Sequence, residues 1–123
     1  MRRHAMLALA AGLVLLAGGA QADGDADRGE KSFKKHCGAC HDLTNKNKLG
    51  PSLTGVIGRK SGTVAGFKYT AAMKEAGVTW TPELIDTYIT DPKALVKGNN
   101  MAFPGVKSGD ERKDIIAYLG SRK

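Results

Sequence analysis

The chain contains only two cysteines in 123 residues, Cys37 and Cys40, and few aromatic residues: one tryptophan, three tyrosines and three phenylalanines. Two cysteines allow at most one disulfide, and a loop closed over three positions stabilises little, so a fold built on disulfides is excluded. The sequence also lacks an alternating strand pattern, an internal repeat and a low-complexity segment. With so few large side chains, a small domain usually needs a metal or a cofactor besides its own core.

The first residues have the three parts of a secretory signal peptide. Two arginines follow the initial methionine, an uncharged apolar run covers residues 5–17, and the tripeptide AQA ending at Ala22 is a small-x-small cleavage pattern. The run is shorter than the about 20 residues that a membrane-spanning helix needs, although an uncleaved anchor is the alternative. We expect residues 1–22 to be cleaved on export to the periplasm, leaving residues 23–123 as one domain without a permanent membrane anchor.

The charge of the expected domain favours a protein partner. Residues 23–123 carry 17 basic and 12 acidic side chains, a net charge of +5. The lysines and arginines are scattered, and an exported protein rarely meets nucleic acid, so we expect no nucleic-acid partner. A protein with an acidic docking surface suits this charge better.

Helical patterns separated by glycine-rich loops predict an all-α domain of three to five helices. The patterns cover residues 25–35, 68–77, 82–91 and 109–121. The segment 42–66 contains five glycines and one proline and is expected to be an irregular loop. Such a long loop is uncommon in a small domain unless it wraps around something.

The motif CGACH, from Cys37 to His41, has four possible interpretations. A thioredoxin-like redox pair needs a βαβ context, which the sequence lacks. Structural zinc needs a fourth ligand, and the only other histidine of the expected domain, His36, is adjacent to Cys37. A plain disulfide would leave His41 without a role. The spacing C-x-x-C-H is the signature of covalent attachment of a c-type haem, whose two vinyl groups accept two thiols from one helical turn.

If a haem is bound, His41 is the expected iron ligand on one face, and a second ligand is needed on the other. Met101 lies in the loop KGNNMAFPG, an unusual place for a core side chain, and a thioether there could bind iron. Met73, a lysine or an open site are the alternatives, but Met73 lies in a helical pattern and is expected to pack in the core.

The motifs CGACH, GPSLTGVIGRKSG, GFKYTAAMKEAGVTW and YITDPKALVKGNNMAFPG, in this order, resemble class I c-type cytochromes, in particular bacterial cytochrome c2 and mitochondrial cytochrome c. The resemblance covers essentially all of residues 23–123. It implies the small cytochrome c fold, with helices and glycine-rich loops wrapped around one haem c attached through Cys37 and Cys40. It also implies axial ligation by His41 and Met101.

The resemblance implies further roles in binding the cofactor. The Pro51 carbonyl would accept the proton on the other ring nitrogen of the histidine ligand. Arg59, Tyr69 and Trp80 would donate to a buried haem propionate. Tyr88 would lie beside the methionine sulfur.

Other matching positions are structural or depart from the family pattern. Gly29, Phe33 and Tyr118 would form the crossing of the first and last helices. Met73 replaces a common asparagine and Asn99 a common threonine, so the internal polar network is expected to differ.

The resemblance implies a soluble, monomeric one-electron carrier of the periplasm that is not an enzyme. It would shuttle electrons between membrane complexes or periplasmic dehydrogenases and an oxidase or reaction centre. A haem enzyme or ligand sensor, or a subunit held in a larger complex, are the alternatives. Lysines would attract a redox partner with an acidic docking surface; the candidates are Lys35, Lys46, Lys48, Lys93, Lys97 and Lys107.

Overall fold

The computed structural model describes residues 24–123 and, before them, Gly12. The expected signal peptide, residues 1–22, therefore lies outside the described residues apart from that glycine. Within the described part of the chain, no helix combines the length and apolar character needed to cross a membrane.

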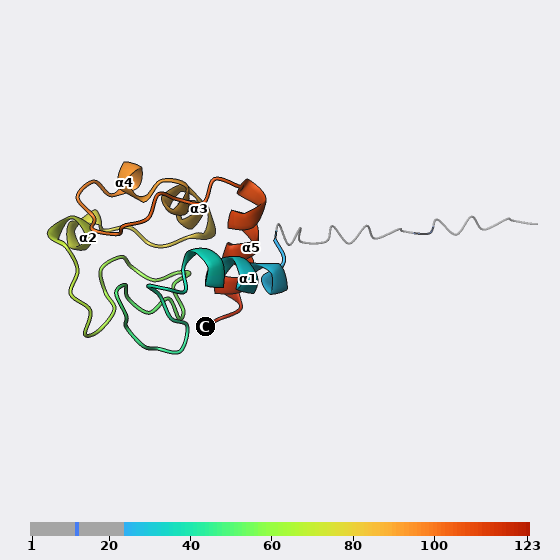
Figure 1. Cartoon of the computed structure of the whole chain (residues 1–123), viewed down its shortest axis with the longest axis horizontal. Coiled ribbons are helices and arrows are strands. Elements are labelled where there is room, and N and C mark those ends of the chain that lie inside the picture. Colours follow the sequence, from blue (N-terminus) through green and yellow to red (C-terminus); the bar gives the residue numbers. More distant parts are fainter. Residues whose placement is uncertain (1–11, 13–23) are drawn as a thin grey trace, which may run out of the picture.

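The described residues form a small all-α domain (Figure 1). Its helices are α1 (Ala26–His36), α2 (Ala71–Ala76), α3 (Pro82–Thr90), α4 (Pro92–Leu95) and α5 (Gly109–Gly120). Strands are absent between residues 24 and 123, where the only pairing of this kind is an isolated antiparallel bridge between Lys60 and Thr79. The expected all-α fold of three to five helices is confirmed.

Side-chain caps explain where the longer helices begin. In each case a side-chain oxygen accepts a hydrogen bond from the backbone N–H three residues later, which satisfies one free donor of the first turn. The capping residues are Asp25, Thr70, Thr81 and Ser108. The sequence patterns missed α4, because Pro92 both ends the preceding helical pattern and begins this four-residue helix.

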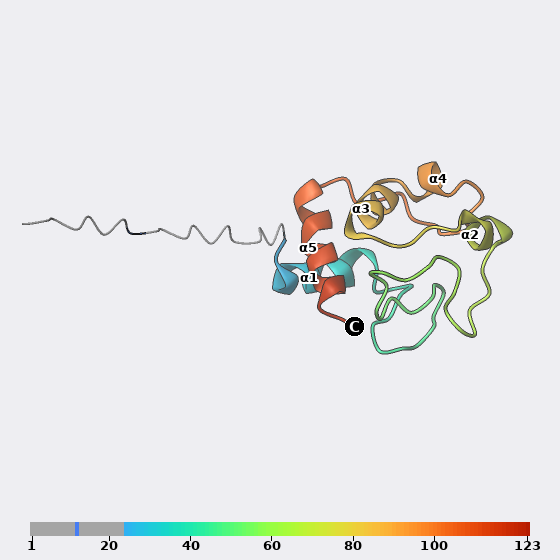
Figure 2. The same cartoon turned by 180° about the vertical axis from the view of Figure 1, so that it is seen from behind.

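Helices α1 and α5 cross at one end of the molecule, which Figure 2 shows from behind. Gly29 makes the close approach possible, because a Cβ atom there would lie 1.8 Å from the Asp114 carbonyl oxygen. Phe33 and Tyr118 pack edge to face beside it, with ring centroids 5.6 Å apart. The structure thus brings together the three residues expected at this crossing.

A polar cluster closes the outer end of the same crossing. The Asp114 carboxylate accepts hydrogen bonds from the Asp25 backbone N–H at 2.8 Å and from the Arg28 Nε at 3.1 Å. The bond from Arg28, then the bond from the Asp25 backbone, lower the pKa of Asp114. The carboxylate therefore stays ionised at neutral pH and ties the residue before α1 to the middle of α5.

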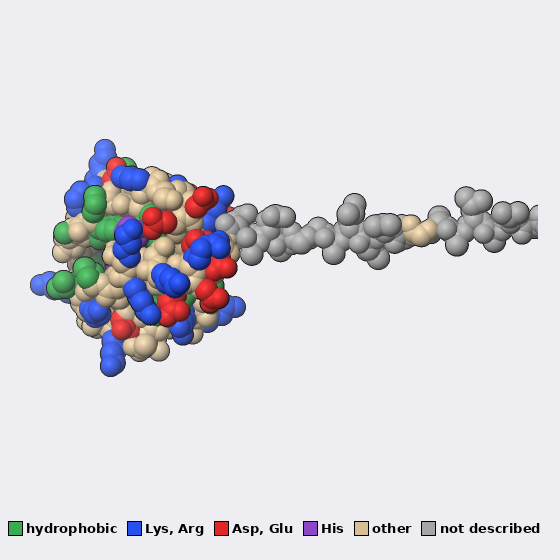
Figure 3. Space-filling model, turned by 45° about the vertical axis from the view of Figure 1, so that its right-hand side comes forward, with side chains coloured by type: hydrophobic (Ala, Val, Ile, Leu, Met, Phe, Trp, Pro, Cys, Tyr) green, Lys and Arg blue, Asp and Glu red, His purple; other side chains and the backbone are tan. Residues whose placement is uncertain are grey.

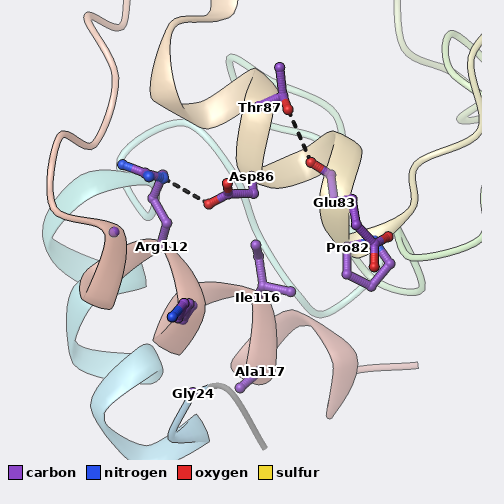
Figure 4. A pocket seen from close by; sticks show the side chains of 10 residues that line it. Gly24, Pro82, Glu83, Asp86, Thr87, Arg112, Ile116 and Ala117 are labelled. Carbon is purple, nitrogen blue, oxygen red and sulfur yellow. Dashed lines mark hydrogen bonds and ion pairs between the residues drawn. The ribbon is translucent and has the colours of Figure 1, made fainter. Parts of the chain in front are cut away.

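A hollow of about 720 Å³ lies on the surface between α3 and α5 (Figure 4). The Arg112 Nε donates to an Asp86 carboxylate oxygen at 2.8 Å across it and so joins the two helices. Other nitrogens of Arg112 donate to the Val106 and Lys107 carbonyls, which fixes the segment that leads into α5. None of the residues expected to bind a cofactor lines this hollow.

We expect Gly29→Ala to lower the free energy of unfolding by about 1–3 kcal/mol or more, because the added methyl group meets a backbone carbonyl that cannot move aside. Guanidinium unfolding of the haem-loaded protein measures the change. Gly109→Ala is the matched control, since its Cβ would lie 3.5 Å from the flexible end of the Arg112 side chain, an ordinary contact. Equal stability of the two variants would contradict the proposed close packing.

Candidate functional site

The core side chains surround a cavity of about 560 Å³. In Figures 1 and 2 the long segment after α1 lies in the lower part of the molecule, and α3, α4 and the segment up to α5 lie in the upper part. Residues of both parts line the cavity, and so do residues of α5. The volume lies within the roughly 300–1,000 Å³ typical of ligand pockets.

The two cysteines lie in the turn that follows α1. The Cys37 N–H donates to the Phe33 carbonyl at 2.7 Å, and the Cys40 and His41 N–H groups both donate to the Cys37 carbonyl, at 3.1 and 3.0 Å. Both thiols are free and both line the cavity. Burial raises the pKa of Cys37 to about 11, and the neighbouring Cys40 adds to the shift, so this thiol is neutral at physiological pH.

The His41 ring is fixed by the loop that follows it. The Nδ1 atom lies 2.8 Å from the Pro51 carbonyl oxygen, which can only accept, so Nδ1 carries the proton and Nε2 keeps a lone pair. Burial lowers the pKa of His41, which outweighs the opposite effect of the Pro51 bond. A neutral, oriented imidazole of this kind is the form in which histidine binds a metal.

Gly50 supports the same ring from the side, and the sequence patterns gave it no role. A Cβ atom at Gly50 would lie 2.4 Å from the Cε1 atom of His41 and 2.7 Å from Nδ1. The Gly50 N–H donates to the Cys40 carbonyl at 2.8 Å, which holds the two segments together. The only sequence signal was the position of this glycine directly before Pro51.

The Met101 sulfur also faces a specific partner. The Tyr88 hydroxyl lies 3.5 Å from the Met101 Sδ and donates to it. Burial raises the pKa of Tyr88 to about 12, so the hydroxyl keeps its proton at neutral pH. Trp80 packs against the Tyr88 ring with centroids 4.9 Å apart. Met73 lines the cavity as well, so both methionines of the described chain reach it.

The three residues expected to meet a propionate line the same cavity. Arg59 donates to the Thr54 carbonyl at 3.2 Å, and burial lowers the pKa of its guanidinium, which still keeps its charge. The Tyr69 hydroxyl accepts from the Val64 N–H at 3.0 Å, and its own proton can still be donated. The backbone of Trp80 pairs with that of Arg59 at 2.9 Å.

These residues fit a covalently attached haem better than a bare metal ion. Between residues 24 and 123, no carboxylate pairs with Arg59, so a partly buried cation borders the cavity without a counter-ion. An anionic group entering the cavity would supply one. His36, the other candidate zinc ligand, instead pairs with Glu111 at 2.8 Å. The described residues contain no group of three or more potential metal-binding His, Cys, Asp or Glu side chains.

The fold and the site define a small all-helical protein with an attachment motif for one prosthetic group. The sequence model of the family described as cytochrome c matches residues 26–123, and the chain belongs to this family. Members bind one haem c covalently through a cysteine pair and transfer electrons. The cofactor is therefore haem c, attached through Cys37 and Cys40, and the protein is an electron carrier and not an enzyme.

The relatives are bacterial and eukaryotic cytochromes. The chain is 50% identical over 98 residues to the cytochrome c-type cyt cy of Rhodobacter capsulatus; the match covers 80% of this chain but only 49% of that protein's length. It is 47% identical over 97 residues to cytochrome c2 of Rhodoplanes tepidamans, covering 77% of this chain and 90% of that protein. The solved structure of cytochrome cH from Methylobacterium extorquens matches with a TM-score of 0.77 and 42% identity, over 80% of this chain and all of that one.

We expect Gly50→Ala to displace the His41 ring and weaken its bond to Pro51, since alanine is free to adopt this backbone but its methyl group would overlap the ring. Proton NMR of the reduced haem-loaded protein should show the Nδ1 proton exchanging about tenfold faster or more. Gly120→Ala, whose Cβ would be an ordinary 3.5 Å from Ile57, is the control. Unchanged exchange in Gly50→Ala would mean that the ring is positioned in another way.

Proposed function

We propose that the protein is a soluble, monomeric one-electron carrier of the periplasm, with His41 and Met101 as the axial ligands of its haem. When bound, the haem supplies an iron atom that accepts and releases one electron. The observation that carries the proposal is the pair of oriented donors at one cavity. The His41 ring presents Nε2 while Pro51 holds Nδ1, and the Met101 sulfur is held by Tyr88.

The chain's own residues keep both ligands in place during electron transfer. Pro51 and Gly50 fix the His41 ring, so the imidazole does not need to reorient when the charge at the site changes. A thioether sulfur has two lone pairs, so the Tyr88 hydroxyl can occupy one while the other remains for a metal. Ligation by both Met101 and His41 would favour the reduced state, and apolar surroundings would add to this effect.

Arg59, Tyr69 and Trp80 would hold the propionate end of the cofactor. The guanidinium without a counter-ion supports this role, since an anion beside it would relieve a partly buried charge. The Tyr69 hydroxyl and the Trp80 indole N–H are neutral donors of suitable kind.

Removal of the expected signal peptide, 1–22, would leave 23–123 as the mature domain.

Electrons would be exchanged with redox proteins that carry acidic docking surfaces. All six candidate lysines are exposed. Two of them lie next to cavity-lining segments: the Lys48 Nζ donates to the Gly38 carbonyl at 2.7 Å, and the Lys93 Nζ to the Met101 carbonyl at 3.3 Å. Leu49, which lines the cavity, is 83% exposed and offers an apolar contact beside Lys48.

The space-filling view agrees with such a surface. In Figure 3 hydrophobic side chains gather on the left of the visible face with lysines and arginines around them, whereas the acidic side chains lie mostly on the right. An apolar patch with a basic rim suits a brief contact with an acidic partner.

Met101→Ala tests the ligand assignment. Loss of the thioether should abolish the weak absorption band of sulfur–iron ligation, lower the midpoint potential and let added imidazole bind. Absorption spectra and a potentiometric titration of the purified holoprotein measure these changes. Met73→Ala is the matched control and should keep the band, although Met73 lines the same cavity. If Met101→Ala kept the band and Met73→Ala lost it, the assignment would be reversed.

The basic docking surface predicts a salt-dependent rate. Oxidation of the reduced protein by hexacyanoferrate(III) should slow as the ionic strength rises from about 0.01 M to 0.5 M, because salt screens the attraction between lysines and an anion. Stopped-flow absorbance measures the rate. Lys48→Glu should flatten this dependence more than Lys113→Glu, which makes the same charge change at the hollow between α3 and α5. Equal effects of the two substitutions would argue for net charge alone.

A further inference from the structure

The loop that carries Met101 is held by one buried side chain. Between the end of α4 and Met101 the chain passes through Gly98, whose φ of 87° lies in the left-handed region, and Asn99. Asn99 is 8% exposed, whereas its neighbour Asn100 is exposed. A polar side chain this far inside a small domain needs partners for its donors and acceptor.

The Asn99 amide has hydrogen-bond partners at both ends of α4 and at Met101. Its Nδ2 donates to the Pro92 carbonyl at 3.0 Å and to the Val96 carbonyl at 2.8 Å. Its Oδ1 accepts from the Met101 N–H at 2.9 Å. One side chain therefore connects the start and end of α4 with the backbone of the proposed ligand.

Only an amide matches this set of partners. Two carbonyl oxygens need donors and one N–H needs an acceptor, and asparagine provides both on a short, rigid side chain. A carboxylate would place acceptors against two carbonyls. An aliphatic side chain would leave the Met101 N–H without a partner and each carbonyl with only its backbone donor. The chemistry of the three partners also settles which atom of the amide is nitrogen.

The part of α4 to which Asn99 bonds is tightly packed. Pro92 is among the most deeply buried side chains, and its carbonyl also accepts from the Val96 N–H at 3.0 Å. Val96 itself is 5% exposed. The Met101 N–H is thus tied to a packed part of the core, and opening the loop would have to break this bond or withdraw Asn99 from its carbonyls.

Two other contacts act on the same loop but differ in kind. The Lys93 Nζ donates to the Asn99 and Met101 carbonyls, both at 3.3 Å, from an exposed position where water can replace it. The Tyr88 hydroxyl contacts the Met101 sulfur and so acts on the side chain alone. Asn99 differs from both, because it is a buried side chain that bonds to the backbone of Met101.

We propose that Asn99 is a positioning residue that clamps the Met101 loop shut, so that the methionine stays bound and external ligands are kept out. The inference rests on the proposed role of Met101 as an iron ligand. Asn99 does not touch the iron in this scheme; it sets how often the loop opens. Replacing Asn99 should therefore shift the equilibrium between the closed and open loop, while His41 and Met101 remain the ligands of the closed form.

Asn99→Leu in the haem-loaded protein is the test, with Asn100→Leu as the matched control. Imidazole titration of the oxidised protein should show about 10- to 100-fold tighter binding in Asn99→Leu. The Met101 N–H loses its buried acceptor, so the loop opens more often and Met101 competes less with imidazole for the iron. Hydrogen exchange of the Met101 N–H should accelerate by a similar factor, again about 10- to 100-fold. The sulfur–iron absorption band should persist, and Asn100→Leu should match the parent protein.

Imidazole affinity and Met101 exchange both within about twofold of the parent would overturn the clamp. If Asn99→Leu gives no holoprotein, Asn99→Ala, which removes the same bonds without added bulk, is measured in the same way. Met101→Ala separates the two proposals. If Met101→Ala loses the band while Asn99→Leu and Asn99→Ala behave like the parent, Met101 is the ligand but Asn99 is not its clamp. If Met101→Ala keeps the band, the assignment of Met101 as ligand fails as well.

Discussion

The packed side chains of this domain surround a cavity instead of closing on one another, and the rest of the structure depends on this arrangement. Phe33, Ile85, Ile115 and Leu119 belong to the buried core, and all four also line the cavity. A protein interior is normally filled to the density of an organic crystal, so an open space of this size leaves its lining without contacts. The covalent haem of the cytochrome c family is thus a structural part of the core as well as the redox group.

The two proposed ligands are held in different ways. His41 lies one turn beyond α1, and its supports, Gly50 and Pro51, follow within ten residues, so this half of the site is local in sequence. Met101 lies on an irregular loop and depends on distant or buried partners, Tyr88 and Asn99. Because the methionine side depends on contacts from further along the chain than the histidine side, it is the side at which the site would yield first.

The sequence allowed the helical pattern over residues 25–35, the attachment motif and the all-α class to be predicted, because these depend on neighbouring residues or on fixed spacing. The pairing of His41 with the Pro51 carbonyl was available only through the family resemblance, and the structure shows it. Gly50 was not assigned a role and the function of Asn99 was not foreseen. Both act through contacts between segments that are apart in sequence. Gly50 leaves room for the His41 ring, and the Asn99 amide bonds to three backbone groups. A hydrophobic periodicity does not encode such contacts.

The crossing of α1 and α5 joins the beginning and the end of the domain. Contacts between segments so distant in sequence form only when the whole chain is present, which slows folding and leaves a chain growing from its N-terminus open for longer. Phe33, four residues before Cys37, has Tyr118 as its packing partner. Until α5 docks, Phe33 lacks this partner, so the end of α1 that leads into the attachment motif is not yet held by the crossing.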